Sequence, residues 1–266
     1  TVMALRRADT AARKAPPCPR ALQGQQHALI DALPFPLTAG QKQVTREISS
    51  DMEQRAPMSR LLQGEVGSGK TIVSLLAMLQ AIDSGRQCAM LAPTEVLATQ
   101  HARSLTTTLA TAGVTATVVL LTGSMPTAAR REALLSVISG QADILVGTHA
   151  LIQDSVEFFD LGLVVVDEQH RFGVEQRDRL RTKGREGLTP HLLVMTATPI
   201  PRTIAMTVFG DLAVSTLREL PGGRRPIQTS VVPAEKPEWV KRAWTRINEE
   251  VAAGHQAYVV CPRIEG

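Results

Sequence analysis

Short apolar runs recur through the middle of the chain and are separated by longer stretches of mixed polarity. Each run has few polar positions, which is typical of strands covered on both faces of a parallel sheet. The predicted strands span residues 59–63, 87–91, 115–121, 143–146, 161–166 and 191–195. A buried parallel sheet is therefore expected in this part of the chain.

Helical stretches with clear stop signals lie between most of these runs. The predicted helices span residues 71–84, 95–112 and 126–139, and a glycine directly follows each of them: Gly85, Gly113 and Gly140. Glycine is common at this position because it adopts the left-handed conformation that ends a helix. The alternation of strands and helices predicts an α/β fold with a doubly wound parallel sheet.

The two ends of the chain have a different pattern. Residues 1–34 are rich in Ala, Arg and Pro and are predicted to be a linker that contains one short helix. After the break at Pro221-Gly222-Gly223, the expected elements are a strand at 227–232, a helix at 235–253 and a strand at 256–261. The predicted organisation is a linker (1–34), an α/β domain (35–220) and the first elements of a second α/β domain (221–266).

Composition narrows the class of protein. No apolar run approaches the roughly 18 residues needed to span a membrane, and the first residues lack the apolar core of a signal peptide. The cysteines, Cys18, Cys88 and Cys261, are too far apart for a zinc site and odd in number for a disulfide framework. We therefore expect a protein of the reducing cytoplasm with no membrane partner.

The charge of the chain bears on its partners. A formal net charge of +4 is only mildly basic, so it permits a nucleic-acid partner without indicating one. Aromatic residues make up 3% of the chain, which is too few for a surface that stacks bases. If a nucleic acid binds, contacts to its backbone should dominate.

Residues 64–71 (GEVGSGKT) match the phosphate-binding loop pattern G-x-x-x-x-G-K-[ST] in full. The match follows a predicted strand and opens a predicted helix, so backbone N–H groups and the helix N-terminus can bind phosphates. Lys70 is expected to reach the β- and γ-phosphates of ATP, and the Thr71 hydroxyl is expected to bind Mg²⁺. The residues assigned to nucleotide binding are Gly64, Gly67, Ser68, Gly69, Lys70 and Thr71.

An acidic pair follows the predicted strand at 161–166. Asp167 and Glu168 come directly after the apolar run, as hydrolysis of a magnesium nucleotide requires. Asp167 is expected to hold Mg²⁺ and Glu168 to polarise the attacking water. Acidic pairs after strands are common, but this one lies roughly 100 residues after the phosphate loop. The candidate catalytic residues are therefore Lys70, Asp167 and Glu168.

Polar clusters follow four further predicted strands, at residues 92–95, 122–124, 147–150 and 196–199. In an open α/β sheet, ligands bind at the carboxyl ends of the strands. Each cluster alone could equally be a helix cap or a turn. Together their hydroxyls and backbone N–H groups suit the binding of phosphates without the reading of bases. These clusters contribute Pro93, Thr94, Thr122, Gly123, Ser124, Thr148 and His149 as candidate phosphate-binding residues.

Taken together, the motifs resemble those of superfamily 2 helicases, and the residues around them resemble the RecG family of branch-migration and fork-remodelling helicases. The stretches that carry the resemblance are residues 33–41, 64–71, 92–101 (APTEVLATQH), 146–153 (VGTHALIQ), 167–177 (DEQHRFGVEQR), 195–203 (MTATPIPRT), 210–212 and 258–265 (YVVCPRIE). Nearly everything from Leu33 onward is covered. Gln169 favours RecG over the related transcription-repair coupling factor, which usually has Glu there. Glu65 departs from the family's usual Asp.

The resemblance implies a RecA-like motor domain of a monomeric, ATP-dependent helicase that acts on branched or forked DNA in repair and recombination. It implies that Gln41 recognises adenine and that Gln169 and His170 couple the γ-phosphate to motion. It also implies that the clusters after the strands hold the DNA, which makes Pro93, Thr94, Thr122, Gly123, Ser124, Thr148 and His149 the candidate DNA-binding residues. A merely packed histidine is the alternative for His170. Phe35 would lie near the base, although packing in the core is the favoured interpretation of Phe35.

The resemblance also implies roles at the last motif and beyond the chain. Thr196, Ala197 and Thr198 would link hydrolysis to domain closure. A wedge domain would precede residue 1, and an arginine finger would lie after residue 266. Two alternatives stay open: the motor of a transcription-repair coupling factor, and a switch that binds ATP and DNA without turnover.

Overall fold

The computed structural model describes residues 13–153, 156–167, 179, 182–198, 212–219 and 229–261. The chain divides into two compact units, Thr1–Gly222 and Gly223–Gly266. Among the described residues, no helix is both long enough and apolar enough to cross a membrane.

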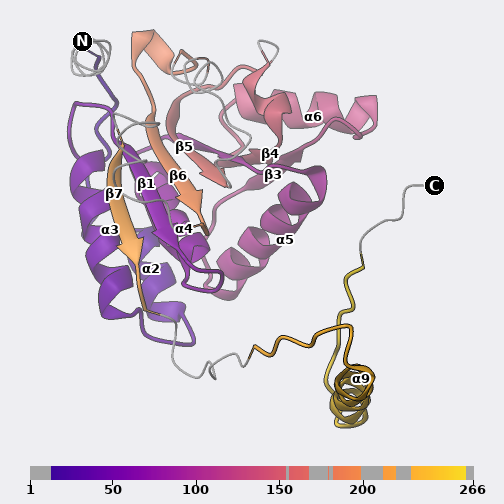
Figure 1. Cartoon of the computed structure of the whole chain (residues 1–266). Helices are drawn as coiled ribbons and strands as arrows, with labels where there is room; N and C mark the ends of the chain where they lie inside the picture. The colour runs from indigo at the N-terminus through magenta and orange to yellow at the C-terminus, as the bar shows by residue number, and fades with distance from the viewer. Residues whose placement is uncertain are drawn as a thin grey trace, which may run out of the picture. The chain divides into compact units, whose positions relative to one another are not determined.

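A seven-stranded sheet forms the centre of the first unit (Figure 1). Its strands, in spatial order, are β3 (Val118–Leu121), β4 (Ile144–Gly147), β2 (Gln87–Leu91), β5 (Leu161–Asp167), β6 (His191–Thr196), β1 (Ser59–Gly64) and β7 (Ala213–Leu217). All neighbouring strands are parallel. The predicted parallel sheet is confirmed, and the largest error at a strand end is the start of β3, at Val118 where residue 115 was expected.

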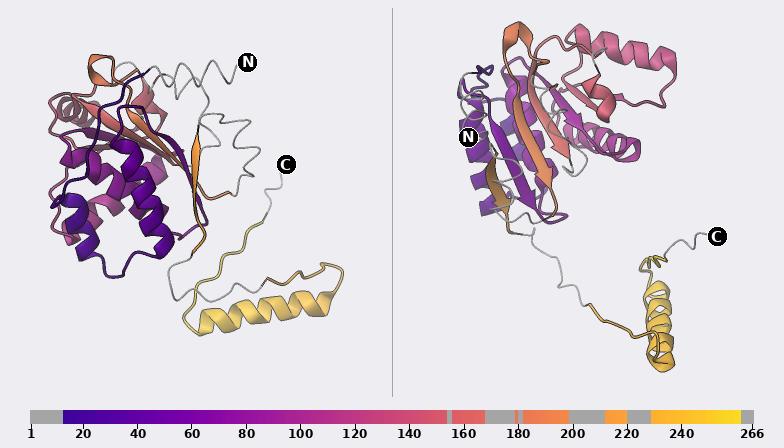
Figure 2. Two further views of the ribbon diagram at one scale, coloured as in Figure 1. Left: turned by 90° about the vertical axis from the view of Figure 1, so that its left-hand side faces the viewer. Right: turned by 45° about the horizontal axis from the view of Figure 1, so that its top comes forward.

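Successive side chains along the strands enter two separate apolar layers. Leu62, Met90 and Val165 pack in one layer with helices α2 (Gln25–Ala32), α3 (Ala39–Met52), α4 (Lys70–Asp83) and α5 (Glu95–Thr111). Their neighbours Leu61, Ala89, Val164 and Val166 pack in the other, with α6 (Thr127–Ile138) and the 3-10 helix η1 (His149–Ile152). The helices lie on opposite faces of the sheet (Figures 1 and 2). This burial on both faces explains the apolar strand sequences, and the doubly wound arrangement is confirmed.

The three predicted helices are confirmed as α4, α5 and α6, with ends that differ from the prediction by one residue. Gly85, just past α4, has a φ of 73°. Its N–H donates to the carbonyl of Ile82, and the N–H of Arg86 donates to that of Ala81. The stop signal at Gly85 therefore works as expected.

One α-helix and one strand of the described part of the first unit were not predicted. Helix α3 begins with a capping box in which the Thr38 hydroxyl accepts from the Gln41 N–H and the Gln41 side chain accepts from the Thr38 N–H. Val44, Ile48 and Met52 recur at helical spacing and are buried. The capping box and the apolar spacing can both be recognised in the sequence. Strand β7 is a short edge strand that pairs only with β1 among the described residues, and its exposed positions weaken its apolar pattern.

The part of the predicted linker that the structure describes packs on the first unit. Ala15, Cys18 and Leu29 are buried in it, and α2 is the expected short helix. The buried Gln80 side chain of α4 donates to the Cys18 carbonyl at 2.8 Å and accepts from the Ser49 hydroxyl at 2.7 Å. Residues 13–34 therefore help to build the first unit.

The second unit contains α9 (Pro237–Ala252), which confirms the helix expected there. The two strands expected beside it are wrong for the described residues, because residues 229–232 and 256–261 are not in strands; residues 227–228 lie outside the described part. An extended segment needs a neighbouring strand for its backbone N–H and C=O groups. The described residues of this unit provide none.

A short 3-10 helix, η3 (Arg185–Gly187), belongs to the first unit.

Candidate active site and nucleic-acid interface

The phosphate loop connects the end of β1 to the start of α4. Gly67 and Gly69 have φ angles of 84° and 90°, which side chains with a Cβ rarely adopt. A Cβ on Gly69 would lie 2.2 Å from Gln41 Nε2, and one on Gly64 would lie 2.5 Å from Ser68 Oγ. Backbone conformation and close packing thus require the motif's glycines at these places.

The polar groups of the loop are suited to an anion. The N–H groups of the first turn of α4 have no acceptor within the helix, and they carry its partial positive charge. The Ser68 hydroxyl is buried and has no hydrogen-bond partner among the described residues. Lys70 Nζ donates to the carbonyls of Gly64 and Glu65 at 2.7 and 3.0 Å. These two carbonyls are neutral acceptors, which a phosphate can replace.

Gln41 supports the loop from α3. Its side chain is 2% exposed, its Oε1 accepts from the Thr38 N–H at 3.0 Å, and its Nε2 donates to the Ser68 carbonyl at 2.9 Å. The amide therefore joins the start of α3 to the phosphate loop. Phe35 is 44% exposed, so the favoured interpretation of a packed core residue is wrong. The run around Phe35 is broken by two prolines and cannot enter the core as a regular element.

The strand that ends in the acidic motif is separated by a single strand from the one that leads into the phosphate loop. Strand β6 lies between β1 and β5, with Gln63 opposite Thr196 and Asp167 opposite Met195. The phosphate loop, Asp167 and Thr196 therefore end three adjacent strands at one edge of the sheet, here called the carboxyl edge. This prediction is confirmed. Glu168, Gln169 and His170 lie outside the described residues.

Asp167 is bound by a residue that the sequence did not single out. His101 of α5 places Nε2 2.6 Å from Asp167 Oδ2. Their side chains are 15% and 16% exposed. Nothing in the sequence joins these positions, because the contact depends on how α5 packs over β5.

The last motif forms a small turn after β6. The Thr196 hydroxyl, which is buried, accepts from the Thr198 N–H at 3.2 Å and lies 2.9 Å from the Thr198 hydroxyl. Ala197 is half-buried between them, and Thr198 is exposed. The turn therefore has a fixed conformation at the carboxyl edge beside the phosphate loop.

Oxygen ligands suitable for a metal ion come from Thr71 and Asp167. Mg²⁺ prefers oxygen and is usually held by one or two carboxylates together with the phosphates of a nucleotide. In the described part of the chain, no group of three or more His, Cys, Asp or Glu side chains could hold a metal ion. Thr71 and Asp167 supply one hydroxyl and one carboxylate, a donor set that fits an ion held together with a nucleotide.

The other candidate residues follow β2, β3 and β4, on the far side of β5 from the phosphate loop. Thr94 caps α5 by accepting from the Leu97 N–H at 3.3 Å, and Pro93 is half-buried. Thr122 and Thr148 are buried, with 4% and 3% exposed. His149 begins η1, and its side chain lies outside what the structure describes. The predicted cluster therefore lies along one stretch of the carboxyl edge.

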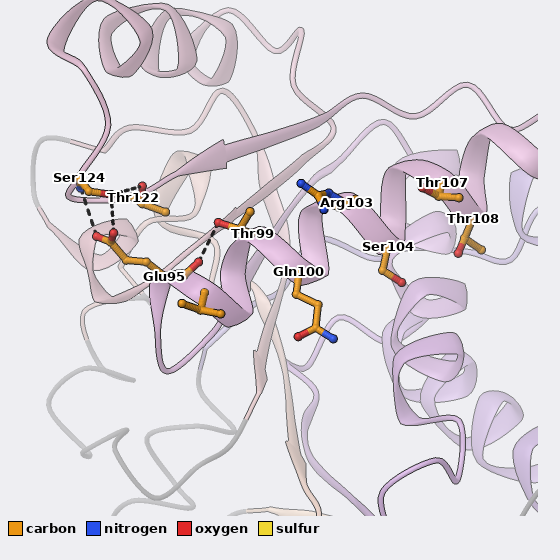
Figure 3. Close-up of a pocket in the computed structure, with 10 residues that line it drawn as sticks. Glu95, Thr99, Gln100, Arg103, Ser104, Thr107, Thr108, Thr122 and Ser124 are labelled. Carbon is orange, nitrogen blue, oxygen red and sulfur yellow. Dashed lines mark hydrogen bonds between the residues drawn. The ribbon is translucent and has the colours of Figure 1, made fainter. Parts of the chain in front are cut away.

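Glu95 occupies the donors of the turn after β3, as Figure 3 shows. Its Oε1 accepts from the Gly123 and Ser124 N–H groups at 2.8 and 3.2 Å, and its Oε2 accepts from the Ser124 hydroxyl at 2.5 Å. These are the donors that the sequence assigned to phosphates of DNA. A carboxylate of the protein itself holds them here, a contact that the sequence did not predict.

A groove of about 780 Å³ runs along α5 beside this turn (Figure 3). Hydroxyl and amide side chains line it, together with one cation, Arg103. Hydroxyls and arginine are common partners of nucleic-acid backbones. The lining residues are Glu95, Val96, Thr99, Gln100, Arg103, Ser104, Thr107, Thr108, Thr122 and Ser124.

Comparisons with known proteins agree with this site. The family model of the DEAD/DEAH box helicase matches residues 38–207. The chain is 56% identical over 270 aligned positions to the ATP-dependent DNA helicase RecG of Mycobacterium leprae, covering 98% of this chain and 36% of that protein. It is 58% identical to RecG of Mycobacterium tuberculosis strain H37Rv, over 89% of this chain and 34% of that protein.

A solved structure gives the same result. RecG bound to a three-way DNA junction superposes with a TM-score of 0.81 at 38% identity, over 99% of this chain and 34% of that one. The predicted RecA-like fold and the resemblance to RecG are confirmed. The chain spans about a third of the length of these relatives.

Proposed function

This chain belongs to the DEAD/DEAH box helicase family, and we propose that it is the ATP-binding motor domain of a RecG-like DNA helicase. The observation that carries the proposal is the meeting of the phosphate loop, Asp167 and Thr196 at the ends of three adjacent strands. The high identity with RecG helicases over nearly the whole chain supports the same conclusion. The reaction is hydrolysis of ATP to ADP and phosphate.

The phosphate loop binds the nucleotide by exchanging acceptors. Lys70 leaves the carbonyls of Gly64 and Glu65 and donates to phosphate oxygens, because hydrogen bonds between charged groups are the stronger ones. The Thr71 hydroxyl and Asp167 would hold Mg²⁺, which when bound neutralises charge on the phosphates. Ser68 presents a buried hydroxyl to the same loop.

The remaining roles follow the family's motifs. Glu168 orients and polarises the attacking water, and Gln169 and His170 sense the γ-phosphate. Gln41 recognises adenine, and the exposed Phe35 lies near the base. The Thr196–Thr198 turn passes the state of the nucleotide to a second motor domain.

DNA is the proposed partner of the ends of β2, β3 and β4. The assigned contacts are Pro93, Thr94, Thr122, Gly123, Ser124, Thr148 and His149. Hydroxyls, backbone N–H groups and a single arginine in the adjoining groove suit a phosphodiester backbone. The substrate proposed is branched or forked DNA, remodelled in recombination and repair by a monomer in the cytoplasm.

The domain organisation is part of the proposal. Residues 35–220 form the ATP-binding domain, and residues 221–266 open the second motor domain. Residues 1–34 connect to a preceding wedge domain, and residues 13–34 also pack on the ATP-binding domain. The division of the chain into units at Gly222 supports the second boundary.

A substitution at the loop lysine tests the function. In the full-length protein that contains this chain, Lys70→Ala should lower ATP hydrolysis in the presence of a three-way DNA junction by at least about 10²–10³-fold. Binding of the junction and the unfolding temperature should stay unchanged. Lys42→Ala removes an exposed lysine from α3 and should keep wild-type turnover. Normal hydrolysis by Lys70→Ala would remove the phosphate loop from the mechanism.

A further inference from the structure

His101 and Asp167 form a contact that joins the two ligand-binding parts of the carboxyl edge. They are 66 positions apart in the chain, and their side-chain atoms Nε2 and Oδ2 lie 2.6 Å apart. Asp167 ends β5, whereas His101 lies on the helix that follows β2. These two strands are neighbours, with Leu91 opposite Val166. A helix that leaves β2 can therefore reach the end of β5.

The contact fixes the orientation of the carboxylate. An ionised carboxylate only accepts hydrogen bonds, so the imidazole N–H must be on Nε2 and donate to Oδ2. Among the described residues, the Asp167 side chain has no other hydrogen-bond partner. With Oδ2 held by His101, rotation of the carboxylate is restricted and Oδ1 is left for another ligand. Partial burial of both side chains limits competition from water.

We propose that His101 is a positioning residue that orients Asp167 for the binding of Mg²⁺ with the nucleotide. The inference rests on the proposed function, because it takes Asp167 as a metal ligand. Carboxylates that bind metal ions are in turn held by hydrogen bonds, and loss of such a partner typically costs about 10–100-fold in metal affinity or activity. His101 itself contacts neither metal nor nucleotide.

The position of His101 on α5 gives the contact a second consequence. The same helix is capped by Thr94, a candidate DNA contact, and carries Glu95 in its first turn. Glu95 in turn binds the candidate contacts Gly123 and Ser124. A helix moves as a rigid element, so a shift of its N-terminus moves His101 with it. The metal site and the DNA-contacting turn thus share one helix.

The test measures metal binding directly. In the full-length protein, binding of a fluorescent, non-hydrolysable ATP analogue is followed while Mg²⁺ is titrated. His101→Ala should raise the half-saturating Mg²⁺ concentration by about 10–100-fold. His101→Gln places an amide N–H near the position of Nε2 and should recover most of the loss. Thr106→Ala removes an exposed hydroxyl that donates to the Ala102 carbonyl of α5 and should behave as wild type.

The outcomes separate this inference from the proposed function. If wild type fails to bind the analogue with Mg²⁺, the proposed function is wrong. If wild type binds it and His101→Ala needs no more Mg²⁺, His101 does not position Asp167. Should His101→Ala fail to fold, His101→Asn serves instead, because its shorter amide cannot reach Oδ2; an unchanged Mg²⁺ requirement in His101→Asn would overturn the inference equally.

Discussion

The two halves of the carboxyl edge are built in different ways. In the nucleotide half, formed by the ends of β5, β6 and β1, the backbone of the phosphate loop is shaped by glycines, and the buried Ser68 hydroxyl has no partner among the described residues. In the DNA half, formed by the ends of β2, β3 and β4, the Gly123 and Ser124 donors are already bound by Glu95. One half is open to an anion, whereas the other already holds one.

This difference concerns the origin of each site's shape. The phosphate loop is set by conformations that only a few residue types allow, so its geometry follows from a local motif. The turn after β3 is set by a carboxylate from another element, 28 positions away in the chain. Substitutions in the nucleotide half should therefore act through the backbone and the ligands, and those in the DNA half through one long-range contact.

The largest effect is expected within the acidic pair of the nucleotide half. In the full-length protein, Glu168→Gln cannot take a proton, so hydrolysis should fall by about 10²–10⁴-fold while Mg–ATP still binds. Asp167→Asn should weaken Mg–ATP binding as well as catalysis. Equilibrium ATP binding and steady-state hydrolysis of both variants provide the measurement. Equal loss of binding in the two variants would make the pair a joint metal shell.

A second prediction concerns the glycine conformation of the loop. Gly69→Ala places a Cβ 2.2 Å from Gln41 Nε2 at a φ of 90°, so both strain and a clash result. The strain alone costs about 1–3 kcal/mol, and we expect nucleotide affinity to fall by roughly tenfold or more. Gly85→Ala has a similar φ of 73° but no atom within 4 Å of the new Cβ. Titration with labelled nucleotide should show wild-type affinity for Gly85→Ala, and equal losses in both variants would exclude a specific role for the loop.

The same contrast explains what the sequence could predict. The six predicted strands could be found in the sequence because the sheet is covered on both faces. The phosphate loop could be found because its glycines serve the local backbone. Helix α3 was not predicted, although the capping box of Thr38 and Gln41 marks its start in the sequence. The sequence could not predict the contacts Glu95–Ser124 and His101–Asp167, because each depends on how α5 packs on the sheet. The prediction of strands in the second unit was wrong for the described residues, because a strand needs a neighbouring strand to pair its backbone N–H and C=O groups.

A third prediction concerns the turn after β3 in the DNA half. Glu95→Ala removes the only acceptor that the described residues offer to the Gly123 N–H, so the turn after β3 loses its fixed shape. Hydrogen bonds to charged groups contribute about 1.5–3 kcal/mol, and exposure reduces this value. We therefore expect affinity for a three-way junction to fall by roughly tenfold, measured by fluorescence anisotropy at constant salt.

A matched charge change serves as the control for Glu95. Glu132→Ala removes an exposed carboxylate from α6 and should leave the affinity unchanged. Tighter binding by Glu95→Ala would show instead that Glu95 competes with a phosphate for these donors. The DNA half would then resemble the nucleotide half, with an internal anion in the place of its ligand.

The smallest effect is expected at the amino ends of β6 and β1, where the buried His191 supports the nucleotide half. His191 Nδ1 accepts from the Met58 N–H at 3.0 Å, and its Nε2 donates to the Pro16 carbonyl at 2.9 Å. In the neutral ring, both nitrogens of His191 therefore have a hydrogen-bond partner. A second proton would have to bind Nδ1, where it would face the N–H of Met58. Burial accordingly lowers the pKa of His191 below its usual 6.5.

Acid should therefore destabilise the fold through His191. Because the unfolded chain binds this proton more readily, the stabilisation is complete above about pH 6.5 and is lost as the pH falls from there through the lowered pKa. The free energy of unfolding should drop by at most about 1.4 kcal/mol per pH unit from this group. Urea denaturation at several pH values between 8 and 5 measures the slope. His191→Gln keeps a donor and an acceptor but cannot titrate, so its slope should be shallower than that of wild type. An identical slope would place the acid sensitivity elsewhere.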